Sequence, residues 1–261
     1  MKRFLICLAL TFTFIFSGCG SIASTETANP APPEIFEQTT PCLPDTEETE
    51  EKKKHYAVAT VNGLNIRTSP TTESAVLGRL DKFDAVSITG EKNGFYQTVY
   101  KEKTAYVSKS YCQVLSVDKS TESVEKAIEV GSSLLGYPYV WGSQRYHWGN
   151  GKLNSDFVEG EFDCSALTLY AFYKSNGVIL SLTSREQSRN GVEVNKSDLK
   201  RGDLMFFTNA SRKDKTGIER IGHVGVYFGA NYILHTASDH AVIEPISETR
   251  WGYYITARRV V

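Results

Sequence analysis

The sequence has 261 residues, of which 29 are Lys or Arg and 30 are Asp or Glu, so the formal net charge is -1. Hydrophobic residues make up 41%, aromatic residues 11% and charged residues 23%. This composition excludes a wholly disordered chain and a protein with many membrane spans. The near-neutral charge gives no general reason to expect nucleic-acid binding. Five irregularly spaced cysteines exclude a disulfide scaffold and disfavour a zinc ribbon.

Residues 1–18 are predicted to be an export signal. A short basic start precedes an apolar run over 4–16 that is too short for a permanent membrane helix. The run ends in Phe16-Ser-Gly-Cys19, which resembles a bacterial lipoprotein cleavage site, although Leu is usual in place of Phe16. The resemblance implies that Cys19 is the lipid-attachment residue, which would tether the mature protein to the outer face of a membrane. The alternative is an ordinary secretory signal cut a few residues later, which would release the protein outside the cytoplasm.

Residues 19–54 are predicted to be a disordered linker, because they are rich in Thr, Glu and Pro and cannot bury a core. Cys42 lies in this linker. It either pairs with Cys112 or both remain thiols, and the sequence leaves the two open.

Residues 55–116 are predicted to form a small all-β barrel, because short alternating stretches are separated by turn residues. The stretches cover 56–61, 85–89, 95–99 and 104–107. The segments Leu64-Asn-Ile-Arg-Thr-Ser-Pro70 and Ala105-Tyr-Val-Ser108 resemble the bacterial SH3-like domain. The resemblance implies a targeting or substrate-flanking role, and the alternative is a structural barrel without a ligand of its own.

Residues 120–261 are predicted to form an α+β domain, in which helices pack on an antiparallel sheet. A first helix is expected to end at Gly136, and a second is expected from Cys164 to Asn176, ending at Gly177. Strand-like runs follow, over 203–207, 223–228, 232–235, 242–246 and 254–257.

Cys164 is the first candidate for chemistry. It follows Asp163, a favourable N-cap residue, and opens an amphipathic segment, so it is expected at the first helical position. Free amides and the helix dipole at that position favour a reactive thiolate. The alternative is a buried, inert cysteine that packs as a small hydrophobe.

His223 and His235 lie the same number of residues before and after Gly229 in the sequence. A hairpin centred on Gly229 would therefore place them directly opposite each other, with Cβ atoms roughly 5 Å apart. A slip of one residue in the turn would make them diagonal neighbours. One imidazole can then take the proton of Cys164 while the other orients the first, as in a cysteine hydrolase.

Three other interpretations of these residues stay open. The first is a zinc site of Cys164, His223 and His235, for which only His240 or His147 offers a fourth ligand. The second is a set of independent structural histidines. The third is an inactive enzyme fold that is retained for binding.

A family resemblance joins these observations. Its five segments, in chain order, are Tyr137-Pro-Tyr-Val-Trp-Gly142, Phe162-Asp-Cys-Ser-Ala-Leu167, Arg201-Gly-Asp-Leu-Met-Phe-Phe207, Gly222-His-Val-Gly-Val-Tyr-Phe-Gly229 and Ile233-Leu-His-Thr-Ala237. They resemble the NlpC-type bacterial cell-wall cysteine peptidases. The resemblance implies a papain-like core, with Cys164 as nucleophile, His223 as base and His235 as the third polar residue. It also implies hydrolysis of the γ-D-glutamyl bond to a diamino acid in peptidoglycan stem peptides.

The resemblance also implies substrate contacts. Tyr139 and Trp141 belong to the first segment, and Tyr139 matches a tyrosine that hydrogen-bonds the substrate or the developing oxyanion. Asp163, Ser165 and Ser184 match residues that contact the free amino end of the stem peptide in some members, and the alternative for these three is helix capping. The backbone amide at the helix start is a natural oxyanion donor.

The sequence departs from the family pattern at three places. Ala166 and Ser143 stand where Gly is usual, and the segment 144–161 is longer than the usual connection to the nucleophile. This segment is expected either to line the substrate cleft or to form a surface loop.

The sequence therefore predicts an exported, lipid-anchored peptidoglycan hydrolase that binds a stem peptide or muropeptide and needs neither a metal nor an organic cofactor. Two rival functions remain. One is an amidase or acyltransferase that acts on another wall or lipid substrate, and the other is a non-catalytic lipoprotein that binds the wall.

Overall fold

The computed structural model describes residues 51–237 and 239–261, which belong to one compact unit. The predicted signal peptide, Cys19, Cys42 and nearly all of the linker lie outside the described residues, so the predictions about them remain predictions. Within the described ranges, no helix combines the length and the apolar character needed to cross a bilayer.

The N-terminal part of the unit is all β, as predicted. Its eight strands are β1 (Lys53–Ala59), β2 (Leu64–Arg67), β3 (Val76–Leu80), β4 (Ala85–Ser87), β5 (Gly90–Lys92), β6 (Phe95–Tyr100), β7 (Lys103–Ser108) and β8 (Cys112–Asp118), with a short 3₁₀ helix η1 (Lys109–Tyr111) before the last. They form two antiparallel sheets, ordered β4-β1-β8 and β3-β2-β7-β6-β5. Alternate residues such as Ile66, Ala105 and Val107 are fully buried, which gives the barrel its core.

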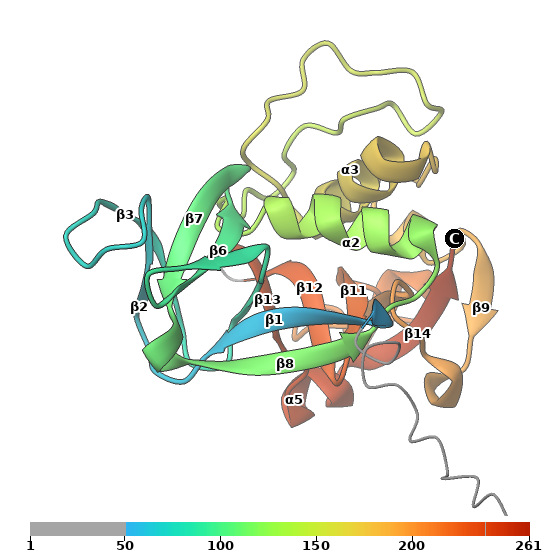
Figure 1. The fold of residues 1–261 in the computed structure, drawn as a ribbon. Helices are drawn as coiled ribbons and strands as arrows, with labels where there is room; N and C mark the ends of the chain where they lie inside the picture. The colour runs from blue at the N-terminus through green and yellow to red at the C-terminus, as the bar shows by residue number, and fades with distance from the viewer. Residues whose placement is uncertain (1–50, 238) are drawn as a thin grey trace, which may run out of the picture. The chain divides into compact units, whose positions relative to one another are not determined.

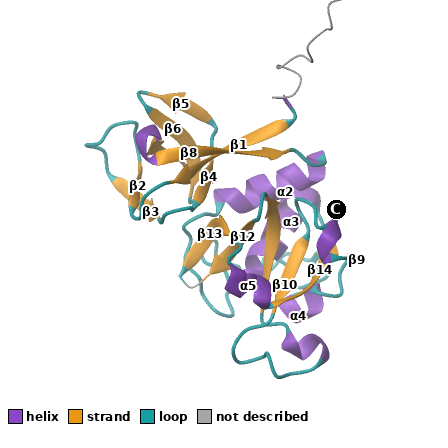
Figure 2. Cartoon of the chain, turned by 90° about the horizontal axis from the view of Figure 1, so that it is seen from below, coloured by secondary structure: helices purple, strands orange, loops and turns teal. Residues whose placement is uncertain are grey.

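The C-terminal part is α+β, as predicted. Its elements are α2 (Glu122–Ser133), α3 (Cys164–Asn176), α4 (Ser184–Gln187), β9 (Val192–Val194), η2 (Lys196–Asp198), β10 (Leu204–Phe207), η3 (Gly217–Arg220), β11 (His223–Gly229), β12 (Tyr232–Ala237), β13 (His240–Pro245), α5 (Glu248–Gly252) and β14 (Tyr254–Arg259). One six-stranded antiparallel sheet has the order β13-β12-β11-β10-β14-β9. Helices α2 and α3 lie on one face of this sheet and α5 on the other (Figures 1 and 2).

Helix α3 begins and ends where the sequence predicts. The Asp163 side chain accepts a hydrogen bond from the amide of Ala166, and Gly177 ends the helix in the left-handed conformation with φ 67°. Nine consecutive residues from Cys164 to Phe172 are buried, because the sheet covers one side of the helix and the 144–161 segment covers another. The nucleophile candidate is therefore fixed at the end of a rigid, enclosed element.

The two faces of the sheet carry two separate hydrophobic clusters. The larger cluster includes Phe206, Val224 and Leu234 and continues into α2, α3 and the barrel. The smaller one consists of Met205, Phe207, Ile233 and Ile246, with the aromatic residues around α5 packed against it. Side chains alternate between the faces along each strand, so the odd-numbered positions of β10 to β12 point towards α5.

Arg201 joins the barrel to the α+β part. Its guanidinium donates to the carboxylate of Glu125 in α2, to the carbonyl of Phe228 and to the hydroxyl of Tyr56 in β1. The side chain of Arg201 is only 5% exposed. A buried charge is tolerated only when its hydrogen bonds are satisfied, so Arg201 can be buried between the two parts only because these three partners accept its hydrogen bonds.

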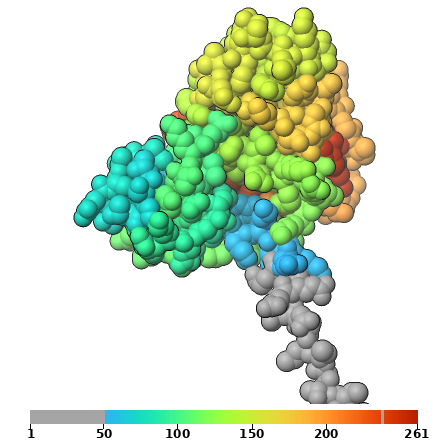
Figure 3. Space-filling view, turned by 45° about the horizontal axis from the view of Figure 1, so that its top comes forward, coloured from blue at the N-terminus to red at the C-terminus, as the bar shows by residue number. Residues whose placement is uncertain are grey.

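The 144–161 segment forms a surface loop on the outer side of α3, in yellow at the top of Figure 3. Tyr146 makes edge-to-face contacts with Phe157, Tyr170 and Tyr173 at ring-centroid distances of 5.0–5.8 Å. Such contacts hold the loop by burial of aromatic surface. Of the two expectations for this segment, the surface loop agrees with the structure.

Candidate active site

The hairpin of β11 and β12 corrects the predicted register. Val226 pairs with Leu234 and Tyr227 pairs with Ile233, so His235 lies opposite Gly225 and diagonal to His223. The prediction that the two histidines are directly opposed is wrong. The turn is centred on Ala230 and Asn231, which have φ values of 50° and 64°, and not on Gly229.

The two imidazoles nevertheless meet. Nε2 of His223 lies 2.8 Å from Nδ1 of His235, and their ring centroids are 5.1 Å apart. The missing side chain at Gly225 makes this contact possible, because a Cβ there would lie 3.0 Å from Cβ of His235 and 2.6 Å from Cδ1 of Ile233. Gly225, which lies opposite His235 and two residues after His223, thus allows the diagonal hydrogen bond between the two imidazoles.

The chain of hydrogen bonds continues to a residue that the sequence analysis missed. Nε2 of His235 lies 2.9 Å from Oε1 of Glu244 in β13, and the same oxygen accepts from Nη2 of Arg250 at 3.1 Å. The only sequence signal was a lone carboxylate within the apolar stretch Val242-Ile-Glu-Pro-Ile246. Such a carboxylate is unusual in a strand and calls for a partner.

This chain fixes the positions of the imidazole protons. Burial alone would raise the pKa of Glu244, but the hydrogen bond from His235 and the charge of Arg250 lower it, so Glu244 is ionised and can only accept. His235 must then carry its proton on Nε2 and accept at Nδ1 from Nε2 of His223. The lone pair of His223 is therefore on Nδ1, which is free to act as a base.

Cys164 lies at the start of α3 and is only 7% exposed. Its thiol interacts with the backbone amides of Val224 and Ser165. Val224 directly follows His223, so the sulfur lies against the chain at the start of β11. As the first residue of a helix, Cys164 also has an amide that no helical carbonyl can bond.

Burial opposes the thiolate that the helix start favours at Cys164. Burial and the nearby Asp163 carboxylate raise the pKa of the Cys164 thiol to about 11, and the amides of Val224 and Ser165 only partly oppose this. The helix terminus is therefore outweighed by the cost of a buried charge. Burial also lowers the pKa of His235, and lowers that of His223 to well below 6.5 with help from the charges of His235 and Arg250. At pH 7 the Cys164 thiol and the His223 imidazole are thus both neutral.

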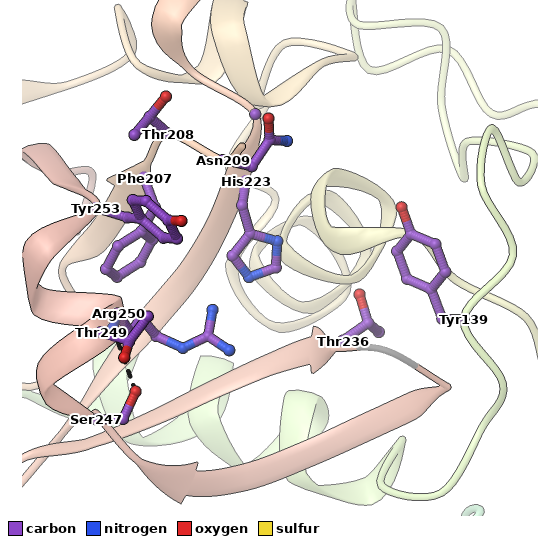
Figure 4. Close-up of a pocket in the computed structure, with 11 residues that line it drawn as sticks. Tyr139, Phe207, Thr208, Asn209, His223, Thr236, Ser247, Thr249, Arg250 and Tyr253 are labelled. Carbon is purple, nitrogen blue, oxygen red and sulfur yellow. Dashed lines mark hydrogen bonds between the residues drawn. The ribbon is translucent and has the colours of Figure 1, made fainter. Parts of the chain in front are cut away.

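A cavity of about 450 Å³ opens beside His223 (Figure 4). Tyr139 and Thr236 line the cavity on one side of the His223 ring, and Arg250 and Tyr253 line it on the other. Burial, followed by the charge of Cys164, raises the pKa of Tyr139, so this phenol is a hydrogen-bond donor at neutral pH.

Of the five predicted substrate contacts, only Tyr139 lines this cavity. Trp141 is 85% exposed and lies outside the cavity wall. Ser184 is buried in α4, and the helix cap there is Thr183, not Ser184. Asp163 and Ser165 are also buried and already have partners.

The partner of Asp163 and Ser165 is Arg145, another residue that the sequence analysis missed. Nη2 of Arg145 lies 2.8 Å from Oδ2 of Asp163 and 3.1 Å from Oγ of Ser165, and its other nitrogens donate to the carbonyls of Leu182 and Ser143. The guanidinium of Arg145, from the 144–161 segment, thus binds the two side chains that the resemblance expects to bind the amino group of the substrate. The capping alternative for Asp163 is confirmed by its bond to the amide of Ala166.

The zinc interpretation has no geometric support within 51–237 and 239–261, where no group of three His, Cys, Asp or Glu side chains is arranged to hold a metal ion. His240 pairs with Asp239 at 2.7 Å. His147 accepts from the amide of Gly149 and packs against Tyr173 on the far side of α3.

Residues 136–260 match the model of the NlpC/P60 family, and residues 62–113 match that of the bacterial SH3 domain. Two relatives are each named gamma-D-glutamyl-L-lysine dipeptidyl-peptidase. The one from Bacillus cereus is 34% identical over 145 residues, which are 54% of this chain and 38% of the relative. The one from Bacillus subtilis is 31% identical over 169 residues, which are 64% and 49% of the two chains.

The match is partial in length for both relatives, since this chain spans less than half of either one. Among solved structures, an NlpC/P60 family protein from Bacillus cereus is 25% identical and superposes with a TM-score of 0.42, over 82% of this chain and 66% of the other.

Proposed function

We propose that the protein is a cysteine endopeptidase of the bacterial cell wall, because residues 136–260 match the model of the NlpC/P60 family and residues 62–113 match that of the bacterial SH3 domain. Its proposed substrate is the γ-D-glutamyl bond to the diamino acid of a peptidoglycan stem peptide. The observation that carries the proposal is the hydrogen-bonded series from His223 through His235 to Glu244. It begins at the residue before Val224, whose backbone amide interacts with the thiol of Cys164. The names of the relatives support the choice of substrate.

In the first half of the reaction, Nδ1 of His223 takes the thiol proton while Sγ of Cys164 attacks the γ-carbonyl carbon. The carbon–sulfur bond forms and the carbonyl electron pair moves to oxygen, towards which the Cys164 amide and the Tyr139 hydroxyl donate. When the carbonyl re-forms, the carbon–nitrogen bond breaks and the imidazolium of His223 protonates the departing amine. A resting neutral pair requires this concerted transfer, because the thiol does not ionise by itself at neutral pH.

In the second half, water attacks the thioester and gives a proton to His223. The carbon–sulfur bond breaks, the sulfur regains a proton from the imidazolium, and the D-glutamyl carboxyl group is released. His235 and Glu244 hold the His223 ring in one tautomer and stabilise the imidazolium in both halves.

Purified peptidoglycan tests the proposal. The wild type is expected to release peptides whose mass and terminal residues identify a cut at the γ-D-glutamyl bond, and Cys164→Ala is expected to release none. Cys112→Ala, which removes the other described cysteine, is the matched control and is expected to keep the wild-type rate. Undiminished release by Cys164→Ala would refute the assignment. Cleavage at another bond would favour the amidase or acyltransferase alternative.

We also propose that the protein is exported and lipid-anchored through Cys19, which rests on the signal-like sequence of residues 1–18. Metabolic labelling with a radioactive fatty acid is expected to mark the wild type but not Cys19→Ser. A wild-type protein that is secreted without label would refute the anchor and favour the ordinary secretory signal.

A further inference from the structure

The turn between β6 and β7 of the barrel contacts the end of α2 (Figure 1). Its two central residues, Lys101 and Glu102, have φ values of 50° and 57°. Asn and Gly are usual in such left-handed turns, and other residues keep this conformation when their surroundings hold them in it. The amide of Lys101 donates to the carbonyl of Leu135 at 3.0 Å, and that of Glu102 donates to the carbonyl of Ser133 at 2.8 Å. The barrel thus satisfies carbonyls at the helix end, where the helix itself supplies no donor.

Two side-chain contacts extend this junction by two residues. The ring of Tyr100 is only 5% exposed and packs on the backbone of Gly136, where a Cβ would lie 2.0 Å from Cζ of the ring. The hydroxyl of Tyr137 donates to Oε2 of Glu102 at 2.9 Å. A side chain at position 136 would therefore overlap the Tyr100 ring and push the two parts of the molecule apart at this point.

The segment that follows Gly136 is paired on both edges and leads to Tyr139. Pro138 pairs with His240 in the antiparallel sense, and Tyr139 pairs with Phe162 in the parallel sense. Backbone hydrogen bonds of 2.7–3.2 Å join the segment to both neighbours. A short strand that is held on both edges moves as one piece, so a displacement at its start is passed on to Tyr139.

We propose that the barrel positions Tyr139 through this junction, which makes the barrel a part of the catalytic unit. Tyr100 and Glu102 are then positioning residues that act through Tyr139. The inference rests on the proposed function, in which the Tyr139 hydroxyl donates to the developing oxyanion in the cavity beside His223 (Figure 4). Placement of such a donor matters, because an error of about 1 Å can cost about 100-fold in rate.

Gly136→Ala tests the junction, because its methyl group would overlap the Tyr100 ring. On a soluble γ-D-glutamyl-L-lysine peptide, kcat is expected to fall about 10-fold or more while KM stays within about 2-fold, since the oxyanion contact forms only in the transition state. Gly94→Ala is the matched control. Gly94 also has a left-handed φ, of 78°, but nothing lies within 4 Å of a Cβ built there, so this variant should keep the wild-type kcat.

A double-mutant cycle with Tyr139→Phe separates positioning from a general loss of stability. Tyr139→Phe alone is expected to lower kcat by about 100- to 1,000-fold, the effect of removing one oxyanion donor. In that background Gly136→Ala should change kcat by less than about 3-fold, because the group that it misplaces is already gone. Equal factors for Gly136→Ala in the two backgrounds would overturn the proposal.

Glu102→Ala tests the same coupling at an exposed position, and it decides the matter if Gly136→Ala does not fold. Loss of one hydrogen bond is expected to lower kcat by about 2- to 10-fold, and Glu102→Gln, which keeps an acceptor, should recover most of this loss. A wild-type kcat in Glu102→Ala would contradict the inference and leave the proposed function intact. A wild-type protein that hydrolyses no γ-D-glutamyl peptide would instead refute the proposed function, and the inference with it.

Discussion

Replacement of Glu244 by Gln tests the hydrogen-bonded series at its far end. The carboxylate can only accept, and this fixes the proton of His235 on Nε2 and leaves Nδ1 of His223 unprotonated. A Gln amide can donate as well as accept. When it donates, His235 turns into the other tautomer and the proton of His223 shifts to Nδ1, where it blocks the base.

The exposure of Glu244 sets the magnitude. Amidation of a fully buried triad carboxylate lowers kcat by about 10⁴-fold. The side chain of Glu244 is 33% exposed, so water replaces part of its interaction with His235. We therefore expect kcat/KM to fall by about 10- to 100-fold, which is about 1.4–2.7 kcal/mol of transition-state stabilisation.

The pH profile of kcat/KM distinguishes this role from a structural one. In the wild type the low pKa of His223 places the loss of activity on the acid side below pH 6.5. Removal of the negative charge leaves Arg250 unopposed, which lowers the imidazole pKa values further, so this limb should move to lower pH in Glu244→Gln. Glu248→Gln, an exposed carboxylate in α5, is the matched control. A profile of unchanged shape and height in Glu244→Gln, with an unchanged melting temperature, would refute the tautomer argument.

Three further changes probe packing and charge. Gly225→Ala places a Cβ 2.6 Å from Cδ1 of Ile233, so we expect a loss of about 1–3 kcal/mol in the free energy of unfolding and a lower kcat/KM, measured by denaturant titration and peptide hydrolysis. Glu125→Ala leaves Arg201 buried without its ion-pair partner and should cost about 3–5 kcal/mol; a loss below 1 kcal/mol would contradict this view of the domain junction. Asp84→Asn tests pH dependence. Burial raises the pKa of Asp84 from 3.8 to about 6. Ionisation of Asp84 therefore lowers the free energy of unfolding progressively as the pH rises from about 4 to about 6. The variant should gain stability relative to wild type at pH 8, by at most about 3 kcal/mol, and gain little at pH 4, as thermal melting at the two pH values can show.

The elements that the sequence predicted best are those with local causes. Asp163 and Gly177 supply the cap and the stop of α3, and both act within a few residues of the helix ends, so its bounds of Cys164 and Asn176 agree with the prediction. Four of the eight barrel strands, β2, β3, β5 and β8, lie outside the predicted stretches. Strand β8 was missed because most of its residues are exposed, and α5 of the C-terminal part because it is a single turn. Neither has the periodicity on which such predictions depend.

The register of the central hairpin could not be derived from local spacing. A hairpin centred on Gly229 and one centred on Ala230 and Asn231 differ by one residue in the turn, and both are compatible with the sequence. The structure selects the second, and the absence of a side chain at Gly225 then lets His235 reach His223 diagonally. The histidine contact was thus predicted correctly while its geometry was not.

The protonation states of the site depend on long-range packing, which the local sequence pattern does not specify. A helix start favours a thiolate when it faces water, but Cys164 is buried, and the negative charge of Asp163 raises the pKa of its thiol further. The enclosed pair then depends on Glu244, which is 80 residues away in sequence, to hold a neutral imidazole in the right tautomer. Burial that suppresses spontaneous ionisation of the thiol therefore requires a correctly oriented base, and Glu244 supplies that orientation through its hydrogen bond with His235.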